Sequence, residues 1–163
     1  MPQSYFGCKK SNNKWRLVQD LQIINEAVVP LYPVVPNPYT LLFEIPEQAK
    51  YFSVTDLKPA FFTIPLLEER KLSFAFKDPT QKSSQLTWTV LPQGFCDHPH
   101  LFGQSLSQSL QNLNSPKAVV LQFVDDILHC AETEEACSQT SKDFLNFLTS
   151  CDYKASREKA QLC

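Results

Sequence analysis

Two short apolar runs with a pair of acids between them form the clearest hydrophobic pattern in the chain. Residues 119–121 and 127–128 are aliphatic and β-branched, and Asp125 and Asp126 separate them. Runs of this kind predict strands, so the pattern predicts a hairpin with the acids at its turn. Two interpretations stay open here. Asp is common in ordinary surface turns, and paired carboxylates can also hold a divalent metal ion at the edge of a core.

Alternation of apolar and polar positions predicts further strands. Residues 51–57 alternate and place Asp56 at the end of the predicted strand. Residues 15–19, 63–66, 72–76 and 85–90 show shorter versions of the pattern, and the last two predict a second hairpin.

Helical spacing marks two longer segments. Apolar residues recur through 101–113 at intervals that predict an amphipathic helix, which Pro116 ends. Thr133 is a suitable N-cap for a second helix, with Glu134 and Glu135 in its first turn. Residues 20–25 and 39–45 predict short helices. Strands mixed with helices in this order predict an α+β domain, with an antiparallel sheet covered by helices on one face.

Four prolines between residues 30 and 38 interrupt these patterns. Their spacing favours an extended polyproline II conformation. Either a ligand for an SH3-type domain or a rigid crossing segment fits this spacing, and the lack of a basic anchor nearby favours the crossing segment.

Composition narrows the function classes. The chain has 163 residues, 43% of them hydrophobic, with 12 Phe, which is enough for one domain or a piece of a larger one. A formal net charge of −2 argues against a general polyanion-binding protein. The tail at residues 153–163 is basic, with Lys154, Arg157 and Lys159, and residues 1–17 contain four lysines and arginines and no acid. This arm is either simply solvated or a segment that meets phosphate.

Six cysteines show no CxxC pair and no zinc-ligand spacing, although Cys96 lies close to His98. We interpret them as free or buried thiols of a reducing compartment. The chain shows no signal peptide and no apolar run long enough to span a membrane. We therefore expect an intracellular protein of the cytoplasm or nucleus that is not secreted and has no membrane partner.

The predicted strand end at Asp56 and the hairpin tip can lie side by side in one sheet. Three carboxylates at one sheet edge repel one another unless cations are present. Mg²⁺ prefers oxygen ligands and commonly binds one or two carboxylates together with substrate phosphates. Two such ions about 4 Å apart can activate an attacking hydroxyl and stabilise a leaving pyrophosphate.

Six segments then show a resemblance. In order along the chain, from about Cys8 to Cys163, the sequence resembles retroviral reverse transcriptase, most closely the gammaretrovirus-like polymerases of endogenous retroviruses. The matching segments are WRLVQDL (15–21), VPNPY (35–39), DLKPAFF (56–62), QLTWTVLPQGF (85–95), FVDD (123–126) and KAS (154–156).

The resemblance implies an RNA-directed DNA polymerase that joins a dNTP to a primer 3′-hydroxyl. Asp56, Asp125 and Asp126 match the catalytic carboxylates that bind two Mg²⁺ ions, for which Mn²⁺ can substitute. The backbone carbonyl of Leu57 matches an additional ligand. The implied partners are an RNA or DNA template-primer and the dNTP.

The resemblance also implies a nucleotide-binding set. Lys10 and Arg16 match residues that grip the triphosphate, one as a point charge and one as a bidentate fork. Phe61 matches the residue under the sugar, where its ring would exclude a 2′-hydroxyl; simple core packing is the alternative. The remaining matches are Ala60, whose backbone N–H meets the triphosphate, Gln93, which contacts the nucleotide, Gly94, which lets that loop turn, and Phe123 and Val124, which lie near the primer end.

Several positions depart from the family pattern. Pro59 stands where Asp is usual and removes a backbone N–H that would hold phosphate. Phe123 replaces the usual Tyr, residues 96–99 replace a stretch that normally carries Lys and Ser, and Asn13 replaces a turn glycine.

By resemblance, residues 1–50 and 64–92 correspond to fingers, and residues 51–63 and 93–163 to palm. Thumb, connection and RNase H domains are expected to be absent from this chain, so we expect the 163 residues alone to be weak or inactive as a polymerase. The alternative is a non-catalytic endogenous retroviral remnant, acting, if at all, as a nucleic-acid-binding or interaction module.

Overall fold

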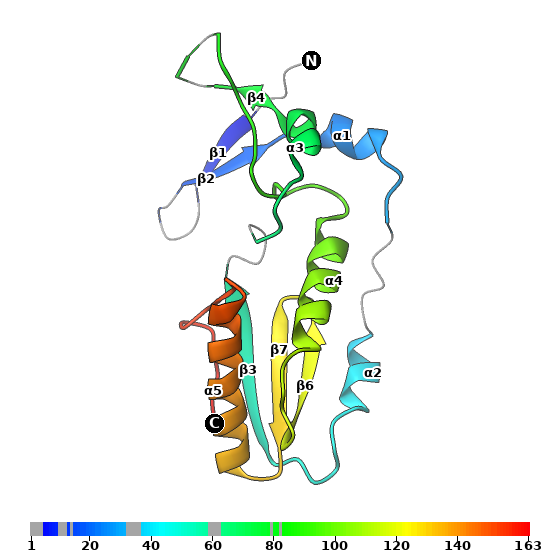
Figure 1. Ribbon diagram of the computed structural model, residues 1–163, viewed down its shortest axis with the longest axis vertical. Helices are drawn as coiled ribbons and strands as arrows, with labels where there is room; N and C mark the ends of the chain where they lie inside the picture. The colour runs from blue at the N-terminus through cyan, green and yellow to red at the C-terminus, as the bar shows by residue number, and fades with distance from the viewer. Residues whose placement is uncertain are drawn as a thin grey trace. The chain divides into compact units, whose positions relative to one another are not determined.

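The computed structural model describes residues 5–9, 13, 15–31, 37–58, 63–78, 80–81 and 83–163 (Figure 1). For residues 5, 6, 16 and 58 it describes the backbone only. The chain divides into two compact units. One comprises Met1–Tyr32 and Phe61–Pro99, and the other comprises Pro33–Ala60 and His100–Cys163.

A four-stranded antiparallel sheet forms the centre of the second unit (Figure 1). Its strands lie in the order β6 (Ala118–Phe123), β7 (Asp126–Ala131), β3 (Tyr51–Lys58) and β8 (Lys154–Ala155). The predicted hairpin and the predicted strand at 51–57 are confirmed. The sequence did not predict β8, which is only two residues long.

Two helices cover one face of this sheet. They are α4 (His98–Leu110), which belongs to this unit from His100 onward, and α5 (Glu134–Ser150). The ring of Phe144 in α5 packs 4.7 Å from that of His129 in β7. The ring of Phe102 in α4 lies 6.3 Å from that of Tyr153, three residues after the end of α5. Both helices were predicted, and the α+β fold class is confirmed.

Side-chain caps mark the start of two helices, and the cap at Thr133 is the predicted one. The Thr133 hydroxyl accepts a hydrogen bond from the Ala136 N–H at 3.2 Å, which satisfies one of the free donors at the start of α5. The short helix α2 (Pro38–Leu42) has Asn37 as its N-cap, and the Asn37 side chain accepts from the Tyr39 N–H at 3.0 Å. Both caps therefore fix where these helices begin.

The first unit is built from short elements. β1 (Tyr5–Lys9) pairs antiparallel with β2 (Trp15–Gln19), and β4 (Phe76–Lys77) with β5 (Gln85–Leu86). Between them lie α1 (Gln22–Ala27), α3 (Glu68–Lys71) and the 3-10 helix η2 (Leu72–Phe74). The buried apolar side chains of the first unit include Leu21, Phe74, Phe76 and Leu91.

Three strand predictions for the first unit are wrong in extent. Residues 63–66 contribute only an isolated bridge between Pro65 and Val90, and residues 72–76 form η2 before reaching β4. The strand expected at 85–90 is reduced to β5. α3 places two acids in its first turn and two bases in its last, which suits the helix dipole and overrides the β pattern next to it.

The observed units differ from the expected division into fingers and palm. Residues 33–50 group with the four-stranded sheet, and residues 93–99 group with the first unit. Residues 32–36, which hold most of the predicted crossing segment, lie outside the described part of the chain.

All six cysteines are free thiols. Burial raises the pKa of Cys137 to about 11, with Cys163 nearby adding to the shift. The Ser53 hydroxyl lies 3.3 Å from each of these two sulfurs, so Cys137 acts as a packed, protonated side chain. Within the described segments, no helix has both the length and the apolar character needed to cross a bilayer.

His129 is the most unusual core residue. It is completely buried, and neither ring nitrogen has a hydrogen-bond partner among the described residues. Burial lowers the pKa of His129 from 6.5 to about 4, because the interior disfavours the charged imidazolium.

This depressed pKa predicts a pH-dependent stability. Between pH 6.5 and pH 4 the unfolded chain binds a proton that folded His129 does not, so this contribution is complete above pH 6.5 and is lost as the pH falls toward 4. The free energy of unfolding should drop by about 2 kcal/mol between pH 7 and pH 5 from this group alone. Urea unfolding at the two pH values measures it.

His129→Leu should remove that part of the drop, whereas His100→Gln in α4 should retain it. An unchanged pH dependence in His129→Leu would contradict the assignment.

Candidate active site

Asp56 and Asp126 face each other across the two central strands. They are register partners in the antiparallel pairing of β3 with β7. Since the neighbouring Leu57 N–H donates to the Asp125 carbonyl at 3.0 Å, the Asp56–Asp126 pair is of the non-hydrogen-bonded kind. In such pairs the Cα atoms are about 4.5 Å apart and the side chains share one face. Two carboxylates are therefore held side by side by backbone register alone.

The third carboxylate comes from the tip of the hairpin. Phe123 pairs with Asp126, which leaves Val124 and Asp125 as a two-residue loop between β6 and β7. Val124 has a φ of 56°, and Asp125 has no positive φ. A positive φ at the first loop residue only is the pattern of a type II′ turn, where Gly is usual. This turn carries Asp125 next to Asp126, as the sequence predicted.

Gln122 supports the hairpin from the helix-covered face. Its amide Nε2 donates to the carbonyl of Val124 and to that of Gly103 in α4, both at 3.3 Å. Through Gln122, these two hydrogen bonds link the strained turn to α4.

Leu57 is buried at the same end of β3. The N–H and C=O of one residue in an extended strand point to the same side. Its carbonyl is therefore directed toward the hairpin that carries Asp125. This direction suits the predicted role of the Leu57 carbonyl as an additional oxygen ligand.

The acids influence one another. The pKa of Asp126 is raised, first by loss of hydration and then by the negative charges of Asp125 and Asp56, while Lys159 opposes the shift. A nearby cation stabilises the charged form of carboxylates that lie this close together.

A cation from the chain itself is present. Lys159 Nζ lies 2.7 Å from Asp56 Oδ2, and 10% of the Asp56 side chain is exposed. Among the described residues, no group of three or more Asp, Glu, His or Cys side chains is arranged to hold a metal ion. Cys96 and His98 likewise belong to no such group among these residues.

Gln93 and Gly94 belong to the first unit. Gly94 has a φ of 102°, a conformation that L side chains rarely adopt. Asn25 in α1 clamps this loop: its Nδ2 donates to the Gly94 carbonyl at 2.9 Å, and its Oδ1 accepts from the Cys96 N–H at 3.0 Å. The loop turns at Gly94 as the resemblance implied.

Asp97 is a structural residue in this unit. It is buried, and its Oδ1 accepts from the Leu31 N–H at 2.8 Å. The acid that departed from the family pattern therefore serves an internal contact.

The structure leaves part of the predicted nucleotide-binding set undescribed. Arg16 lies in β2 opposite Cys8, with only its backbone described. Lys10, Pro59, Ala60 and Phe61 lie outside the described residues.

Sequence reasoning missed Lys159 and Asn25. Lys159 stood out only as one base of a basic tail, and nothing in its local pattern shows that it reaches an acid 103 positions earlier. Asn25 lies in a short amphipathic segment where an amide is unremarkable. The match of residues 154–156 to the family was the one available hint of the β8 contact.

Comparisons with known proteins agree with this arrangement. Residues 8–163 match the family described as "Reverse transcriptase (RNA-dependent DNA polymerase)". The Gag-Pol polyprotein of avian reticuloendotheliosis virus is 46% identical over 160 residues, and that of gibbon ape leukemia virus is 44% identical over 160 residues. These alignments cover 95% of this chain but only 14% and 10% of the respective relatives.

Solved structures give the same result for the fold. The foamy viral protease-reverse transcriptase in complex with dsDNA matches with a TM-score of 0.81 at 27% identity, over 99% of this chain and 32% of that chain. The same viral protein with an RNA/DNA hybrid matches with a TM-score of 0.78 at 26% identity, over 99% of this chain and 21% of that one.

The fold is that of the fingers and palm region of a reverse transcriptase. The chain belongs to the reverse transcriptase family, and its resemblance to gammaretroviral Pol proteins is confirmed.

The Val124 turn leads to a stability prediction. A β-branched residue at positive φ is strained, by about 1–3 kcal/mol. Val124→Asn, with a side chain that tolerates this conformation, should raise the free energy of unfolding by about 1 kcal/mol. Chemical denaturation measures the change.

Val29→Asn is the matched control, since Val29 is 89% exposed and has no positive φ. It should change stability by less than about 0.5 kcal/mol. Equal effects of the two substitutions would rule out strain at Val124.

Proposed function

We propose that this chain carries the metal-binding, nucleotidyl-transfer part of an RNA-directed DNA polymerase. The single observation that carries the proposal is the Asp56–Asp126 register pair with Asp125 on the adjoining turn, in a chain of the reverse transcriptase family. The chain spans about a tenth of its curated relatives' length, so the activity of the whole polyprotein is part of this proposal.

The donor set fits divalent magnesium. Asp56, Asp125 and Asp126 supply hard carboxylate oxygens, and the Leu57 carbonyl is directed toward the same hairpin. Burial raises the pKa of Asp126, and the negative charges of Asp125 and Asp56 add to this shift, so a bound cation would stabilise the charged form. When bound, two Mg²⁺ ions (or Mn²⁺) would activate the primer 3′-hydroxyl and neutralise the leaving pyrophosphate. The chain's own task is to hold three acids at fixed spacing.

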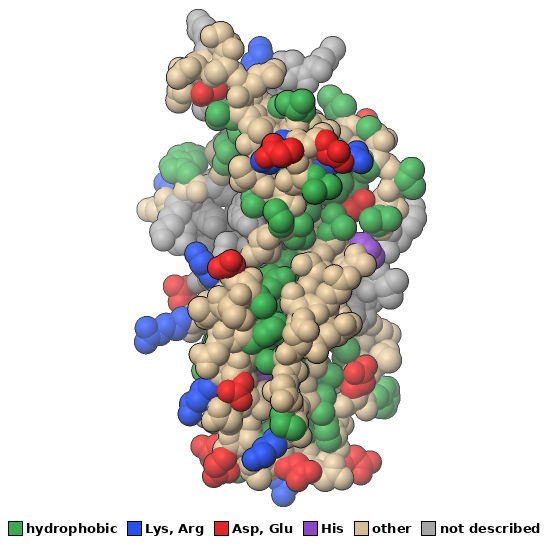
Figure 2. Space-filling model, in the orientation of Figure 1, with side chains coloured by type: hydrophobic (Ala, Val, Ile, Leu, Met, Phe, Trp, Pro, Cys, Tyr) green, Lys and Arg blue, Asp and Glu red, His purple; other side chains and the backbone are tan. Residues whose placement is uncertain are grey.

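A template-primer and a dNTP complete the proposal. Two structural relatives were solved with dsDNA and with an RNA/DNA hybrid. On the face in Figure 2, acidic and basic described side chains are interspersed rather than gathered by sign. Electrostatics alone therefore gives no sign of broad polyanion binding on that face. The more specific grip would come from Lys10, Arg16, Ala60, Phe61 and Gln93 on the nucleotide, and from Phe123, Val124 and Gly94 near the primer and template.

We also propose that the first unit acts as fingers and the second as palm. The acids all lie in the second unit, and the clamped Gln93–Gly94 loop lies in the first. In this assignment the sheet performs the chemistry and the first unit supplies contacts to the nucleotide.

A chimera tests the proposal. The 163 residues replace the matched residues of a related viral polymerase, and primer extension is measured with Mg²⁺ on RNA and DNA templates. We expect template-directed extension. Asp125→Asn should lower its rate more than about a hundredfold, since even outer-shell partners of a metal contribute about 10- to 100-fold. The control Asp143→Asn, an exposed residue of α5, should leave the rate unchanged.

An inactive chimera that regains activity with Pro59→Asp would place the defect at the triphosphate contact and leave the carboxylate site competent. A folded chimera that stays inactive with and without Pro59→Asp would contradict the proposal. That result would favour the non-catalytic remnant.

A further inference from the structure

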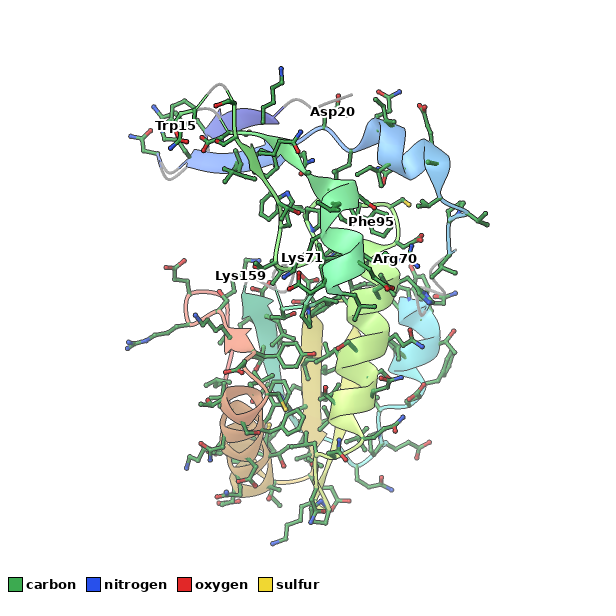
Figure 3. All side chains as sticks on the ribbon, turned by 45° about the horizontal axis from the view of Figure 1, so that its top comes forward. Trp15, Asp20, Arg70, Lys71, Phe95 and Lys159 are labelled. Atoms are coloured by element: carbon green, nitrogen blue, oxygen red, sulfur yellow. The ribbon has the colours of Figure 1, made fainter. Side chains whose placement is uncertain are left out.

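The segment that carries Lys159 is fastened to β3 on both sides of that residue. Before it, the Ser156 N–H donates to the Asp56 carbonyl at 2.7 Å. After it, Gln161 exchanges two backbone hydrogen bonds with Val54, at 2.7 and 2.9 Å. Between these points the chain turns, with the Ala160 N–H donating to the Ser156 carbonyl at 2.9 Å. The backbone of Lys159 is therefore fixed beside the end of β3 (Figure 3).

The Lys159 ammonium lies in the field of all three acids. It contacts Asp56 Oδ2 at 2.7 Å. The negative charges of Asp126, the register partner of Asp56, and of Asp125 on the adjoining turn also act on this ammonium. Among the described residues, one positive charge thus faces the whole carboxylate group.

We propose that Lys159 is the resident counter-cation of the carboxylate site, and that a divalent metal ion must displace its ammonium from Asp56 to bind. The inference rests on the proposed function, because it concerns the same three acids. It adds a positioning residue that holds the site compact before metal arrives and sets how tightly metal binds.

The geometry explains why displacement is required. Mg²⁺ demands oxygen ligands at about 2.0–2.1 Å in nearly octahedral arrangement. An oxygen of Asp56 that accepts from an ammonium at 2.7 Å is directed at the lysine. The acids accordingly form no ready-made metal cluster among the described residues, although two of them are register partners.

The same geometry makes displacement easy. The Lys159 side chain is 65% exposed, so its ammonium can return to water on a flexible four-carbon stem. Ion pairs that stay largely exposed are weak, so the competition with metal is modest. Asp56 is different: its side chain is nearly buried and needs a positive partner at all times, lysine or metal.

Metal affinity without nucleotide tests the inference directly. Binding of Mn²⁺ to the 163-residue chain is followed by the loss of the free-ion electron paramagnetic resonance signal, at fixed pH and ionic strength. Lys159→Met should tighten Mn²⁺ binding about fivefold, in keeping with the strength of an exposed ion pair. Lys159→Arg keeps a cation against Asp56 and should bind Mn²⁺ no more tightly than the unmodified chain.

The control is Lys154→Met, which removes an exposed lysine of β8 from the same short segment. It should leave Mn²⁺ affinity unchanged. Thermal melts give a second readout. In chelator, Lys159→Met should melt below the unmodified chain because Asp56 loses its partner, and Mn²⁺ should raise its melting temperature by more.

Equal or weaker Mn²⁺ binding by Lys159→Met would overturn the inference while leaving the metal site intact. Tighter binding by both lysine-to-methionine variants would also overturn it, since that would reflect general charge. The proposed function fails together with the inference if neither the unmodified chain nor Lys159→Met shows Mn²⁺ binding that depends on Asp125, as judged by its loss in Asp125→Asn.

Discussion

Hydrogen bonding on both edges of β3 is the constraint on which the site depends. One edge pairs with β7 and sets Asp56 against Asp126. The other edge pairs with β8 and, through the following turn, sets Lys159 against Asp56. Backbone pairing on the two edges of β3 thereby brings opposite charges to one strand end. A one-residue slip in either pairing would send the acid of β3 to the other face of the sheet.

Electrostatics then decides how the site behaves. Three negative charges at one strand end repel, and the chain relieves part of this repulsion with Lys159. The relief is partial, because in the described part of the chain one ammonium faces three carboxylates. Among the described residues the arrangement stays short of positive charge, which is why we propose that it takes up divalent ions.

Strands and helices were predicted correctly where the sequence pattern was long and regular. The strand at 51–57, the hairpin around Asp125 and the helices that became α4 and α5 were all predicted, because each has several periods of alternation or a clear cap. The strands expected at 63–66 and 72–76 did not form. Only two or three alternating residues lie on either side of Glu68–Lys71, and the charges of that segment, which suit a helix dipole, outweigh them. The acids could be named from spacing and resemblance. Lys159 could not, since its contact with Asp56 depends on a pairing between segments about a hundred residues apart.

The topology of β3 has a consequence during synthesis. Its two partners follow it by roughly 70 and 100 residues, counted to β7 and β8. At a ribosomal rate of about 5–20 residues per second, the strand waits roughly 4–14 seconds before its first partner has been made. During that interval both edges of an alternating, partly aromatic strand are open to pairing with other chains. The nascent protein therefore passes through a window of aggregation risk, which narrows when the hairpin that carries Asp125 and Asp126 docks and closes when β8 pairs with the other edge.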